Sequence, residues 1–422
     1  MNPHDQAERP TTPDDEKFFT KPIAIIFVTI MIDLIGFGIV NPVLPFYATV
    51  EPFNATPFQL GLLFASFSVM QFIFSPIFGS VSDKYGRRPV LFLSLLGTSA
   101  GFFIVGFATT LWMLFAGRIL DGITGGNIST AQAYIADVTS RKNRAKGMGL
   151  IGAAFGIGFV LGPALGGILS KYGSAVPFCV AGGLALLNAI ALYFFLPESI
   201  KKNAAPVPRA NRFVELFRSL SDPSFRVITI VYFLVVVSFS IMTTSFSLYT
   251  LERFGYDAEK NGYLFFLVGV LSAIVQGGLI GKLTAWFGEA KLVVMGCLLL
   301  TASLFAVPYV GPEHGGLTGL LVGIACFAIG NSIASPGLTS LASKNAADHD
   351  QGKALGVMQS GASLARAIGP LIGGFLLNNA IGRVDDHSIQ LTYWAASAIM
   401  AAALLAAIYF LRSLKKDGGA PA

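Results

Sequence analysis

Unbroken apolar runs of about 20 residues recur along the chain and constrain its fold more than any other feature. Two examples are VLFLSLLGTSAGFFIVGFA (90–108) and LTYWAASAIMAAALLAAIYFL (391–411). A helix of about 20 residues crosses the hydrocarbon core of a bilayer. Charged residues make up 12% of the 422 residues, about half of what is usual in soluble domains. The sequence therefore predicts an all-α, multi-pass membrane protein whose surroundings are the lipid bilayer.

Twelve spans of this kind are predicted. Each is expected to be a helix, because a helix satisfies its own backbone hydrogen bonds in lipid. The expected spans are 22–47, 58–80, 90–109, 111–137, 146–170, 175–196, 226–249, 261–283, 290–309, 317–341, 353–378 and 389–411.

The basic residues predict how these spans are oriented. With the N-terminus inside, the inner loops and tails carry 23 Lys and Arg and the outer loops carry 4. Such an excess marks the cytoplasmic side, so both termini are expected in the cytoplasm and the protein in the cell (inner) membrane. The net charge of +6 then reflects topology and gives no reason to expect a nucleic-acid partner. Residues 1–21 have no short apolar core before a small-residue cleavage site and are interpreted as a solvated tail rather than a signal peptide.

The chain also contains an internal repeat. Segment 146–169 aligns without gaps to 353–376 with seven identities, including the pattern GP..GG. A basic, proline-containing linker separates six spans from six, and two bundles in the same orientation form a parallel repeat. Such repeats are typical of transporters whose substrate binds between the two halves. The expected organisation is a cytoplasmic tail (1–21), a six-helix bundle (22–196), a cytoplasmic linker (197–225), a second six-helix bundle (226–411) and a cytoplasmic tail (412–422).

Four motifs occur in order on the expected spans. They are DLIGFGIVNPVLP (33–45) in span 1, GSVSDKYGRRPVL (79–91) after span 2, LFAGRILDGITGG (114–126) in span 4 and GFVLGPALGG (158–167) in span 5. Together they resemble the motifs of the major facilitator superfamily, and in particular its twelve-span drug:proton antiporters. AYIADVTSRKNRAKGMG (133–149) further resembles the tetracycline-exporter branch. The resemblance extends over essentially the whole membrane region.

The turn after span 2 has two interpretations. The residues alone indicate a tight basic turn on the cytoplasmic side, in which the chain reverses at Gly86 and Asp83 can pair with Arg87. The resemblance implies that Asp83, Arg87 and Asp137 form a charge network that latches the halves in one state. An arginine pairs bidentately with carboxylates, so lysine would be a poor replacement at position 87. The candidate latch residues are Gly79, Asp83, Gly86, Arg87, Arg88 and Asp137.

Glycines recur every four residues in span 5, which places them on one face of the helix. Small residues allow helices to approach closely in membranes, and an internal proline removes one backbone donor and bends its helix. Plain close packing is one interpretation. The resemblance adds a second, a hinge between the halves that favours export. The residues concerned are Gly158, Gly162, Pro163, Gly166, Gly167, Gly369 and Pro370.

Four charged residues are predicted well within spans: Asp33, Arg118, Asp121 and Arg366. Each costs about 2.5–3.5 kcal/mol at a helix centre on insertion scales, so each should face a cavity or a partner. Arg118 and Asp121, three residues apart, can pair on one helix, and the pair either fixes helix register or takes part in proton coupling. Asp33 is either a proton or cation site or a helix-capping or interhelical hydrogen-bond group, and we expect it rather than Asp121 to carry the proton. Arg366 either binds an anionic group or pairs with a carboxylate that steadies its span.

The substrate cavity is expected among polar and aromatic residues of the spans that face the space between the halves. All four histidines fall in tails or loops, which excludes an intramembrane histidine relay. No GxxxxGK[ST] motif is present, so ATP is not the expected energy source. We predict no cofactor, no metal and no enzymatic activity, and the three cysteines are interpreted as packing residues. The expected lining residues are Phe37, Asn41, Asn127, Gln132, Phe246, Tyr249, Asn331 and Arg366.

The functional hypothesis is a monomeric, proton-coupled antiporter that exports a small amphipathic compound by alternating access, as in multidrug efflux and antibiotic resistance. Three alternatives stay open: a symporter or facilitator that imports a metabolite, a flippase for a lipid-like substrate, and a receptor or scaffold that does not transport. The intramembrane charges weigh against the last, because nothing else would offset their cost. Tetracycline itself is disfavoured as the substrate. The resemblance to the exporter branch implies further acids in spans 3 and 9, where this chain has none.

Overall fold

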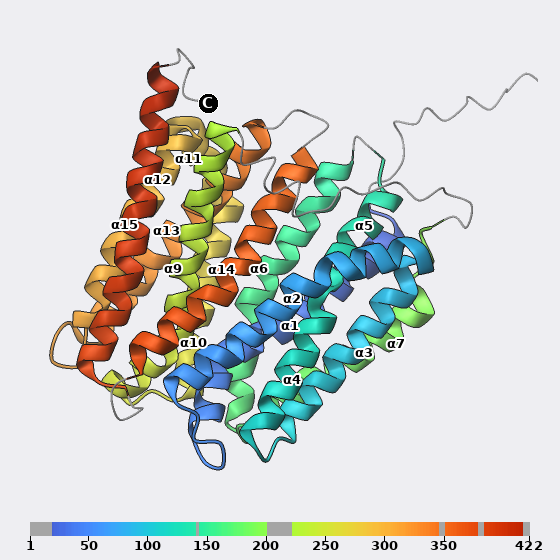
Figure 1. Cartoon of the computed structure of the whole chain (residues 1–422), viewed down its shortest axis with the longest axis horizontal. Coiled ribbons are helices and arrows are strands. Elements are labelled where there is room, and N and C mark those ends of the chain that lie inside the picture. Colours follow the sequence, from blue (N-terminus) through green and yellow to red (C-terminus); the bar gives the residue numbers. More distant parts are fainter. Residues whose placement is uncertain (1–18, 141–142, 201–221, 346–350, 379–383, 417–422) are drawn as a thin grey trace, which may run out of the picture.

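The structure is a computed structural model, and it describes residues 19–140, 143–200, 222–345, 351–378 and 384–416. Most of the predicted tails and of the predicted linker lies outside these ranges. Within them the chain is helical, and no β-strand forms there apart from isolated bridges at Gly311. The helices form two groups (Figure 1). The predicted fold class, an all-α membrane protein built from two six-helix bundles, is confirmed.

The first group contains the elements up to residue 195. They are α1 (Lys21–Thr49), α2 (Pro57–Tyr85), α3 (Arg87–Gly106), α4 (Leu111–Thr124), the 3₁₀ turn η1 (Gly125–Asn127), α5 (Ile128–Val138), α6 (Arg144–Ser170) and α7 (Val176–Phe195).

The second group contains the elements from residue 223 onwards. They are α9 (Pro223–Phe254), α10 (Ala258–Ile274), the π turn η2 (Val275–Leu279), α11 (Ile280–Phe287), α12 (Glu289–Ala306), the 3₁₀ turn η3 (Val307–Tyr309), α13 (Gly316–Asn345), α14 (Gln351–Leu377) and α15 (Asp386–Lys416).

Every predicted span has a helical counterpart, but two spans are not continuous α-helices. The span predicted at 111–137 consists of α4, η1 and α5, and the span predicted at 261–283 contains the π turn η2. At η1 the chain packs tightly against α2, since a Cβ added to Gly126 would lie 3.0 Å from the backbone of Ser75. In the described ranges, 11 helices are individually long and apolar enough to cross a membrane. Together, α4, η1 and α5 make the twelfth crossing.

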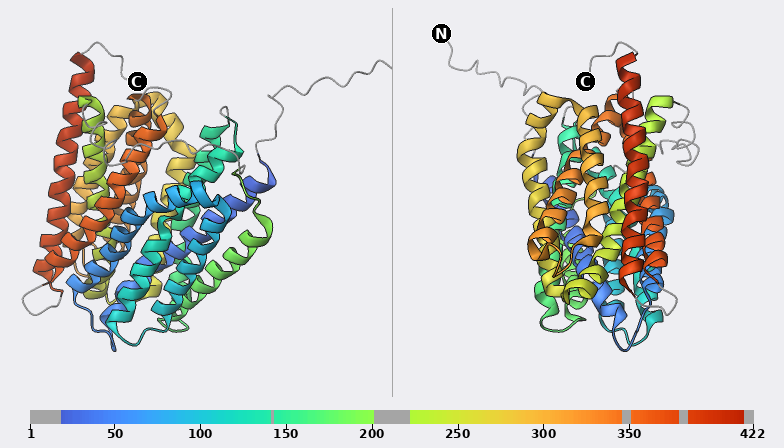
Figure 2. Two further views of the ribbon diagram at one scale, coloured as in Figure 1. Left: turned by 45° about the vertical axis from the view of Figure 1, so that its right-hand side comes forward. Right: turned by 90° about the vertical axis from the view of Figure 1, so that its left-hand side faces the viewer.

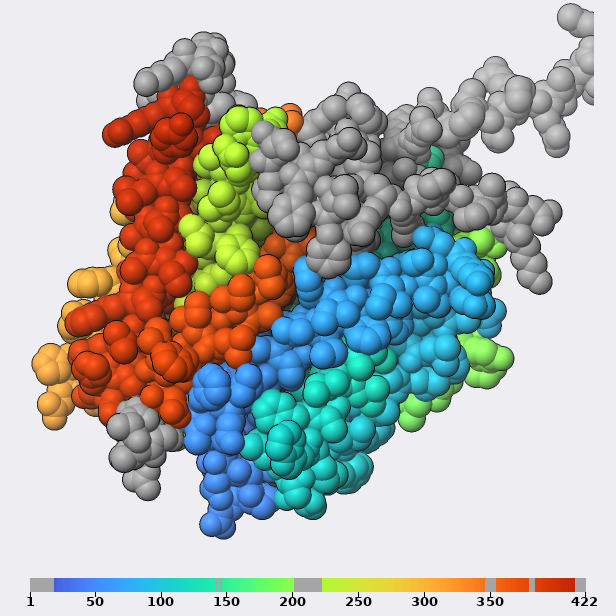
Figure 3. All heavy atoms as spheres, viewed as in Figure 1, coloured from blue at the N-terminus to red at the C-terminus, as the bar shows by residue number. Residues whose placement is uncertain are grey.

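The two groups contact each other along two helix pairs. α1 begins and α15 ends at the same end of the molecule, here named the upper end, and the α1–α2 connection lies at the opposite, lower end (Figure 2). Within the first group α1 packs on α6 and α3 on α7, and within the second α9 packs on α14 and α12 on α13. Between the groups the main contacts are those of α2 with α14 and of α6 with α10. Figure 3 shows α2 in direct contact with α14 across the front of the molecule.

Glycines form both of these contacts near the lower end. Gly374 of α14 faces α2, where an added Cβ would lie 2.5 Å from the carbonyl oxygen of Pro57 and 3.0 Å from Cα of Gly61. Gly167 of α6 faces α10, where an added Cβ would lie 2.9 Å from Cα of Gly262. The backbones therefore touch with no room for a side chain, as is typical of small-residue helix contacts in membranes. We name these four glycines the lower closure.

The lower closure follows the internal repeat. Its glycines on α6 and α14 occupy the same position of the GP..GG pattern. Thr56 and Asp257 are N-caps, since the side chain of each accepts a hydrogen bond from the backbone N–H three residues later. The partner glycines, Gly61 and Gly262, each lie five residues after one of these caps. These caps define where α2 and α10 begin. They thereby set the height at which each glycine meets the other group.

Side chains surround the lower closure at the surface. The rings of Phe58 and Phe375 meet edge to face at 6.4 Å between centroids. Lys171 Nζ, just beyond α6, lies 2.7 Å from Glu259 Oε1 of α10. The hydrogen bond to Glu259 raises the pKa of the Lys171 ammonium group. Both contacts join the two groups on the same side as the glycines.

Candidate functional site

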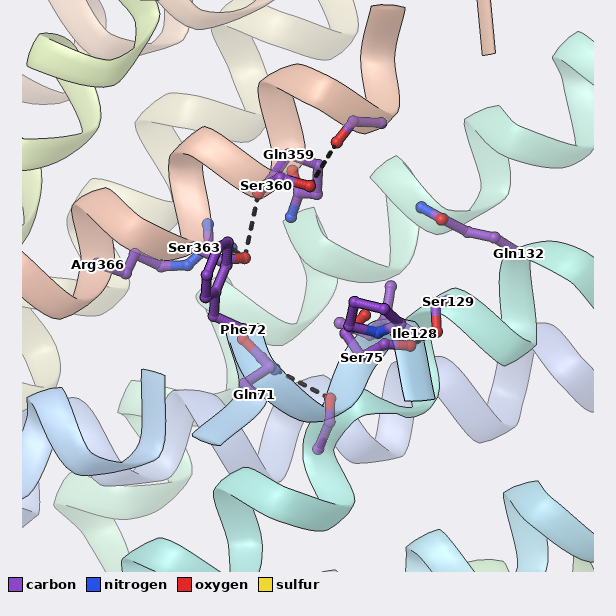
Figure 4. A pocket seen from close by; sticks show the side chains of 13 residues that line it. Gln71, Phe72, Ser75, Ile128, Ser129, Gln132, Gln359, Ser360, Ser363 and Arg366 are labelled. Atoms are coloured by element: carbon purple, nitrogen blue, oxygen red, sulfur yellow. Dashed lines mark hydrogen bonds between the residues drawn. The ribbon is translucent and has the colours of Figure 1, made fainter. Parts of the chain in front are cut away.

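A cavity opens between the two groups, further from the lower end than the lower closure. It holds about 790 Å³ of empty space, including the part that is open to solvent. Three walls enclose it, from α2, from η1 and α5, and from α14 (Figure 4). It is lined by Gln71, Phe72, Ser75, Pro76, Gly125, Ile128, Ser129, Gln132, Gly356, Gln359, Ser360, Ser363 and Arg366.

The α14 wall carries the charge of the cavity. Arg366 Nη2 donates a hydrogen bond to Ser363 Oγ at 3.1 Å. The hydroxyls of Ser360 and Ser363 donate to backbone carbonyls one turn earlier, those of Gly356 and Gln359. In the described part of the chain no carboxylate lies within ion-pair distance of Arg366. The guanidinium is therefore a partly exposed cation beside a row of hydroxyl and amide groups.

The opposite wall is polar but neutral. Gln71 Nε2 donates a hydrogen bond at 3.0 Å to the carbonyl oxygen of Gly125, the first residue of the 3₁₀ turn η1. Ser129 Oγ donates to the carbonyl oxygen of Ser75 at 2.8 Å. These bonds tie α2 to the middle of the fourth crossing. The wall consequently has a defined shape without a charged residue.

Asp33 of α1 lies behind this wall. Asn127 Nδ2 donates to Asp33 Oδ2 at 3.3 Å, and Asn127 directly precedes Ile128, which lines the cavity. The Asp33 side chain is partly exposed, and no cation forms an ion pair with it among the described residues. It is thus an intramembrane carboxylate with a neutral partner.

Arg118 and Asp121 form the ion pair that their spacing allows. Arg118 Nη1 lies 2.8 Å from Asp121 Oδ2, and the two side chains are 2% and 7% exposed. The guanidinium also stacks over the ring of Phe67 at 4.4 Å, a favourable cation–π geometry. Asp33 and Asp121 are close enough to interact electrostatically. Their environments differ, however, because Asp121 is neutralised by a buried cation and Asp33 is not.

The predicted latch residues form a network at the upper end of the first group. Arg87 Nη2 lies 2.6 Å from Asp83 Oδ1, and Arg87 Nε lies 3.1 Å from Asp137 Oδ2. Arg87 Nη1 donates to Ser82 Oγ at 2.6 Å, and that hydroxyl donates to the carbonyl oxygen of Gly79. These contacts join α2, α3 and α5, all of which belong to the first group. A latch between the groups stays a prediction for another conformation.

Glu198 completes this network, although no sequence pattern had indicated it. Its carboxylate accepts hydrogen bonds from the backbone N–H groups of Arg87 and Arg88 at 2.9 and 3.1 Å. A carboxylate is stabilised at a helix N-terminus by the exposed N–H groups and the helix dipole. Gly86 has φ of 106°, a conformation that favours glycine. Arg88 donates to the carbonyl oxygen of Tyr193 and covers its ring.

Comparison with known proteins agrees with this geometry. A family model described as Major Facilitator Superfamily matches residues 26–349 and 315–422. The chain belongs to the major facilitator superfamily. The tetracycline resistance protein of class H from Pasteurella multocida is 33% identical over 406 residues, covering 92% of this chain and 96% of that protein. Multidrug resistance protein 1 of Bacillus subtilis (strain 168) is 32% identical over 361 residues, covering 84% and 90%.

A solved structure gives the same result. The crystal structure of the human organic anion transporter MFSD10 (TETRAN) matches with a TM-score of 0.68 and 25% identity, covering 92% of this chain and 99% of that chain. The family and these relatives are transporters rather than enzymes. The predicted family is confirmed, and the protein is a multi-pass membrane transporter of small molecules.

The remaining predicted residues of this transporter are distributed unevenly. Gln132 and Arg366 line the cavity. Phe37 is not among the lining residues, and its ring packs against Phe67 at 5.6 Å between centroids. Asn41 on α1 is partly exposed and does not line the cavity. Asn331 on α13 also lies away from it, and its side-chain oxygen accepts from Ser335 Oγ at 3.1 Å.

For two residues the prediction that they line the cavity is corrected. Phe246 and Tyr249 are 1% and 0% exposed and belong to the apolar core of the second group. The Tyr249 hydroxyl donates to the carbonyl oxygens of Val307 and Val310 at the turn after α12. The face of α9 that carries these rings is turned towards its own group, so they hold α9 in place and do not line the cavity.

The candidate hinge glycines divide into two kinds. An added Cβ on Gly158, Gly162 or Gly166 would collide with α1, and one on Gly369 would collide with α9. Each of those four residues packs two helices of its own group together. Gly167 instead packs α6 of the first group against α10 of the second. Pro163 and Pro370 lie inside α6 and α14. The close-packing interpretation describes this conformation, and a hinge stays a prediction.

Neutral residues account for most of what sequence reasoning missed. Gln71, Ser75, Gln359, Ser360 and Ser363 line the cavity. Single neutral polar residues are tolerated in membrane helices and do not stand out as charges do. A usable signal existed for the missed glycines of the lower closure, because TPFQLG (56–61) and DAEKNG (257–262) place a glycine five residues after a cap residue in both halves. Glu198 carried no comparable signal.

Replacing Arg87 by lysine should destabilise the upper end of the first group. Three guanidinium nitrogens reach three partners, and a single ammonium group cannot reach all of them. Partners left unsatisfied cost about 1–3 kcal/mol each when buried. The melting temperature of the detergent-purified R87K variant should fall clearly. R88K is the matched control, because Arg88 is only partly buried and its side chain has no carboxylate partner among the described residues, only the carbonyl oxygen and ring of Tyr193. An equal fall in both variants would contradict this role.

Proposed function

We propose that this transporter exports a small amphipathic compound from the cytoplasm in exchange for protons, by alternating access. The relatives support the direction and the substrate type. Those named above are resistance proteins for tetracycline and for multiple drugs and a transporter of organic anions. The substrate classes named there are small compounds. We propose a monomer as the transporting unit, because the two halves of the chain together line the cavity.

The environment of the Asp33 carboxylate is the single observation on which the proposed proton coupling rests. A proton carrier must be an acid that can gain and lose a proton during the cycle, and in a membrane it must lie next to an aqueous space. Asp33 is partly exposed, has an uncharged hydrogen-bond partner and lies next to the cavity wall. Asp121 is less suited, since its side chain is only 7% exposed and is already paired with Arg118 at 2.8 Å.

The basic residues support the orientation. The predicted cytoplasmic loops include the turn with Arg87 and Arg88, which stands at the end of the first group opposite the lower closure. The lower closure then lies on the outer side, and the structure corresponds to an inward-facing state. Residues 22–196 and 226–411 would move as two bodies. Opening to the outside would separate α2 from α14 and α6 from α10, while the upper end closes.

Proteoliposomes test this proposal. Purified protein is reconstituted with a pH-sensitive dye inside, and a panel of amphipathic compounds that includes tetracycline is added under an imposed proton gradient. Antiport predicts that a transported compound moves protons in the opposite direction, and that an imposed gradient drives the compound uphill. Movement of both in the same direction would establish a symporter. Compound movement with no proton flux would establish a facilitator, and either result overturns the proposal.

A further inference from the structure

We propose that Arg366 forms an anion-binding subsite and that the substrate is a small organic anion with an apolar or aromatic body. This inference rests on the proposed transport function and names the class of its substrate. The acidic group would bind between α14 and the facing wall of α2. Carboxylates, sulfonates and phosphates share the chemistry that such a site recognises.

The charge balance within the membrane supports an anion-binding subsite. Of the four intramembrane charges, Arg118 and Asp121 neutralise each other at 2.8 Å. Arg366 has only the Ser363 hydroxyl as a hydrogen-bond partner in the described part of the chain. A lone cation is costly at this depth. An anionic ligand that binds there would offset part of that cost. The guanidinium would then have a counter-charge only while the ligand is bound.

The geometry of the Arg366 guanidinium also suits an anion. Arginine presents five N–H donors in a planar fork that matches the oxygens of a carboxylate or phosphate. Ser363 uses one of them. Figure 4 shows the head of Arg366 directed towards Ser363 and the ring of Phe72 from the facing helix α2. The free donors therefore lie at the cavity, and Phe72 offers a flat apolar surface next to the charge.

The composition of the cavity lining favours an anion over a cation. Its 13 residues include one cation and no Asp or Glu. A cationic compound would find no counter-charge here, while an anion meets the Arg366 guanidinium and the amides of Gln71 and Gln359. Asp33, behind the wall, stays outside the lining and is free to serve the proton. The lining therefore selects for negative charge.

The location links binding to transport. Arg366 lies eight residues before Gly374 on α14, and Gln71 lies ten residues after Gly61 on α2, so the subsite stands directly above one contact of the lower closure. A ligand held by both walls joins the two groups across the cavity. Differential binding of this kind is what allows a substrate to shift a conformational equilibrium.

Counterflow separates this proposal from proton coupling, because it needs no proton gradient. Vesicles loaded with unlabelled 2-naphthoate exchange it for external radiolabelled 2-naphthoate, and the matched compounds are 2-naphthamide and 2-naphthylmethylamine. 2-Naphthalenesulfonate and 2-naphthyl phosphate extend the anionic side of the panel. Wild type should exchange at least one of the three anions at least about 10-fold faster than the amide and the amine, about 1.4 kcal/mol of preference. R366Q should lose that preference, and R366K should keep part of it because its charge persists without the fork.

Several results would overturn the subsite. They are equal exchange of anion and amide by wild type, no exchange of any anion in the panel, or wild-type anion preference in R366Q. The matched control R253Q removes an arginine that lies at the lower end and pairs with Asp386, and it should keep the preference. A homogeneous gel-filtration profile of R366K guards against misfolding. Anion exchange without coupled proton flux would refute the proposed antiport and leave the subsite standing, whereas proton flux driven only by neutral or cationic compounds would do the reverse.

Discussion

The D33N variant is expected to bind and exchange substrate but to lose transport driven by a proton gradient. Asparagine has nearly the same shape and can still bond to Asn127, whose side-chain nitrogen lies 3.3 Å from Asp33 Oδ2. It cannot take up a proton at any working pH. Gradient-driven transport should fall by about 100-fold or more, the scale on which loss of a proton-transfer group acts. Counterflow, which requires no net proton movement, should stay near the wild-type rate.

D121N is the matched control for this prediction, and it should fail in a different way. Removing the charge of Asp121 leaves Arg118 buried without its partner, a change that costs about 3–5 kcal/mol for a buried pair. We therefore expect a lower melting temperature and poorer yield, with counterflow and gradient-driven transport reduced together. The assignment is wrong if D33N keeps wild-type gradient-driven transport, or if D121N is stable and loses coupling alone.

A single methyl group on Gly374 is expected to disrupt the lower closure. An added Cβ would lie 2.5 Å from a carbonyl oxygen and 3.0 Å from Cα of Gly61, and both are backbone atoms that cannot move independently. Overpacking of this kind costs about 1–3 kcal/mol, which changes a two-state equilibrium by about 5- to 150-fold. G374A should therefore populate states with the lower end open, and its transport should fall about 10-fold or more.

G361A is a control on the same helix. A Cβ at Gly361 meets nothing within 4 Å, and alanine is a better helix former than glycine by about 1 kcal/mol. G361A should transport normally. A cysteine that replaces Phe58 beside the lower closure, in a background without the three native cysteines, reports opening by its reaction with an impermeant maleimide. Equal reactivity and equal transport in both alanine variants would show that this contact does not control opening.

The membrane spans and the charged site residues were predictable from sequence for a common reason. Lipid tolerates neither exposed backbone nor isolated charge, so both requirements appear in the sequence as long apolar runs and as rare ionic residues within them. This is why Asp33, Arg118, Asp121 and Arg366 stand out in the sequence as candidate site residues. The Arg118–Asp121 pair was also accessible, because helix geometry alone brings residues three apart together.

The neutral part of the site was decided by tertiary structure. Gln71 and Ser363 lie far apart in the sequence, and nothing in either segment indicates that α2 and α14 face each other across a cavity. The same holds for Phe246 and Tyr249, whose polar and aromatic character suggested a lining but whose face of α9 points into its own core. Short-range periodicity shows which residues share a face of a helix, but not which neighbour that face meets.

By itself the sequence determined the twelve crossings, the parallel repeat and the few charges that lipid makes costly. The tertiary structure alone decided that Asp33 has a neutral partner, that Arg366 has no carboxylate partner among the described residues, and that the glycines of the lower closure bring the backbones of the two groups into contact. The physical reason is the range of the interactions. Lipid acts on each segment separately and leaves its mark in local composition. Helix pairing depends on backbones about 300 residues apart in sequence, such as those of Gly61 and Gly374, meeting without a side chain between them.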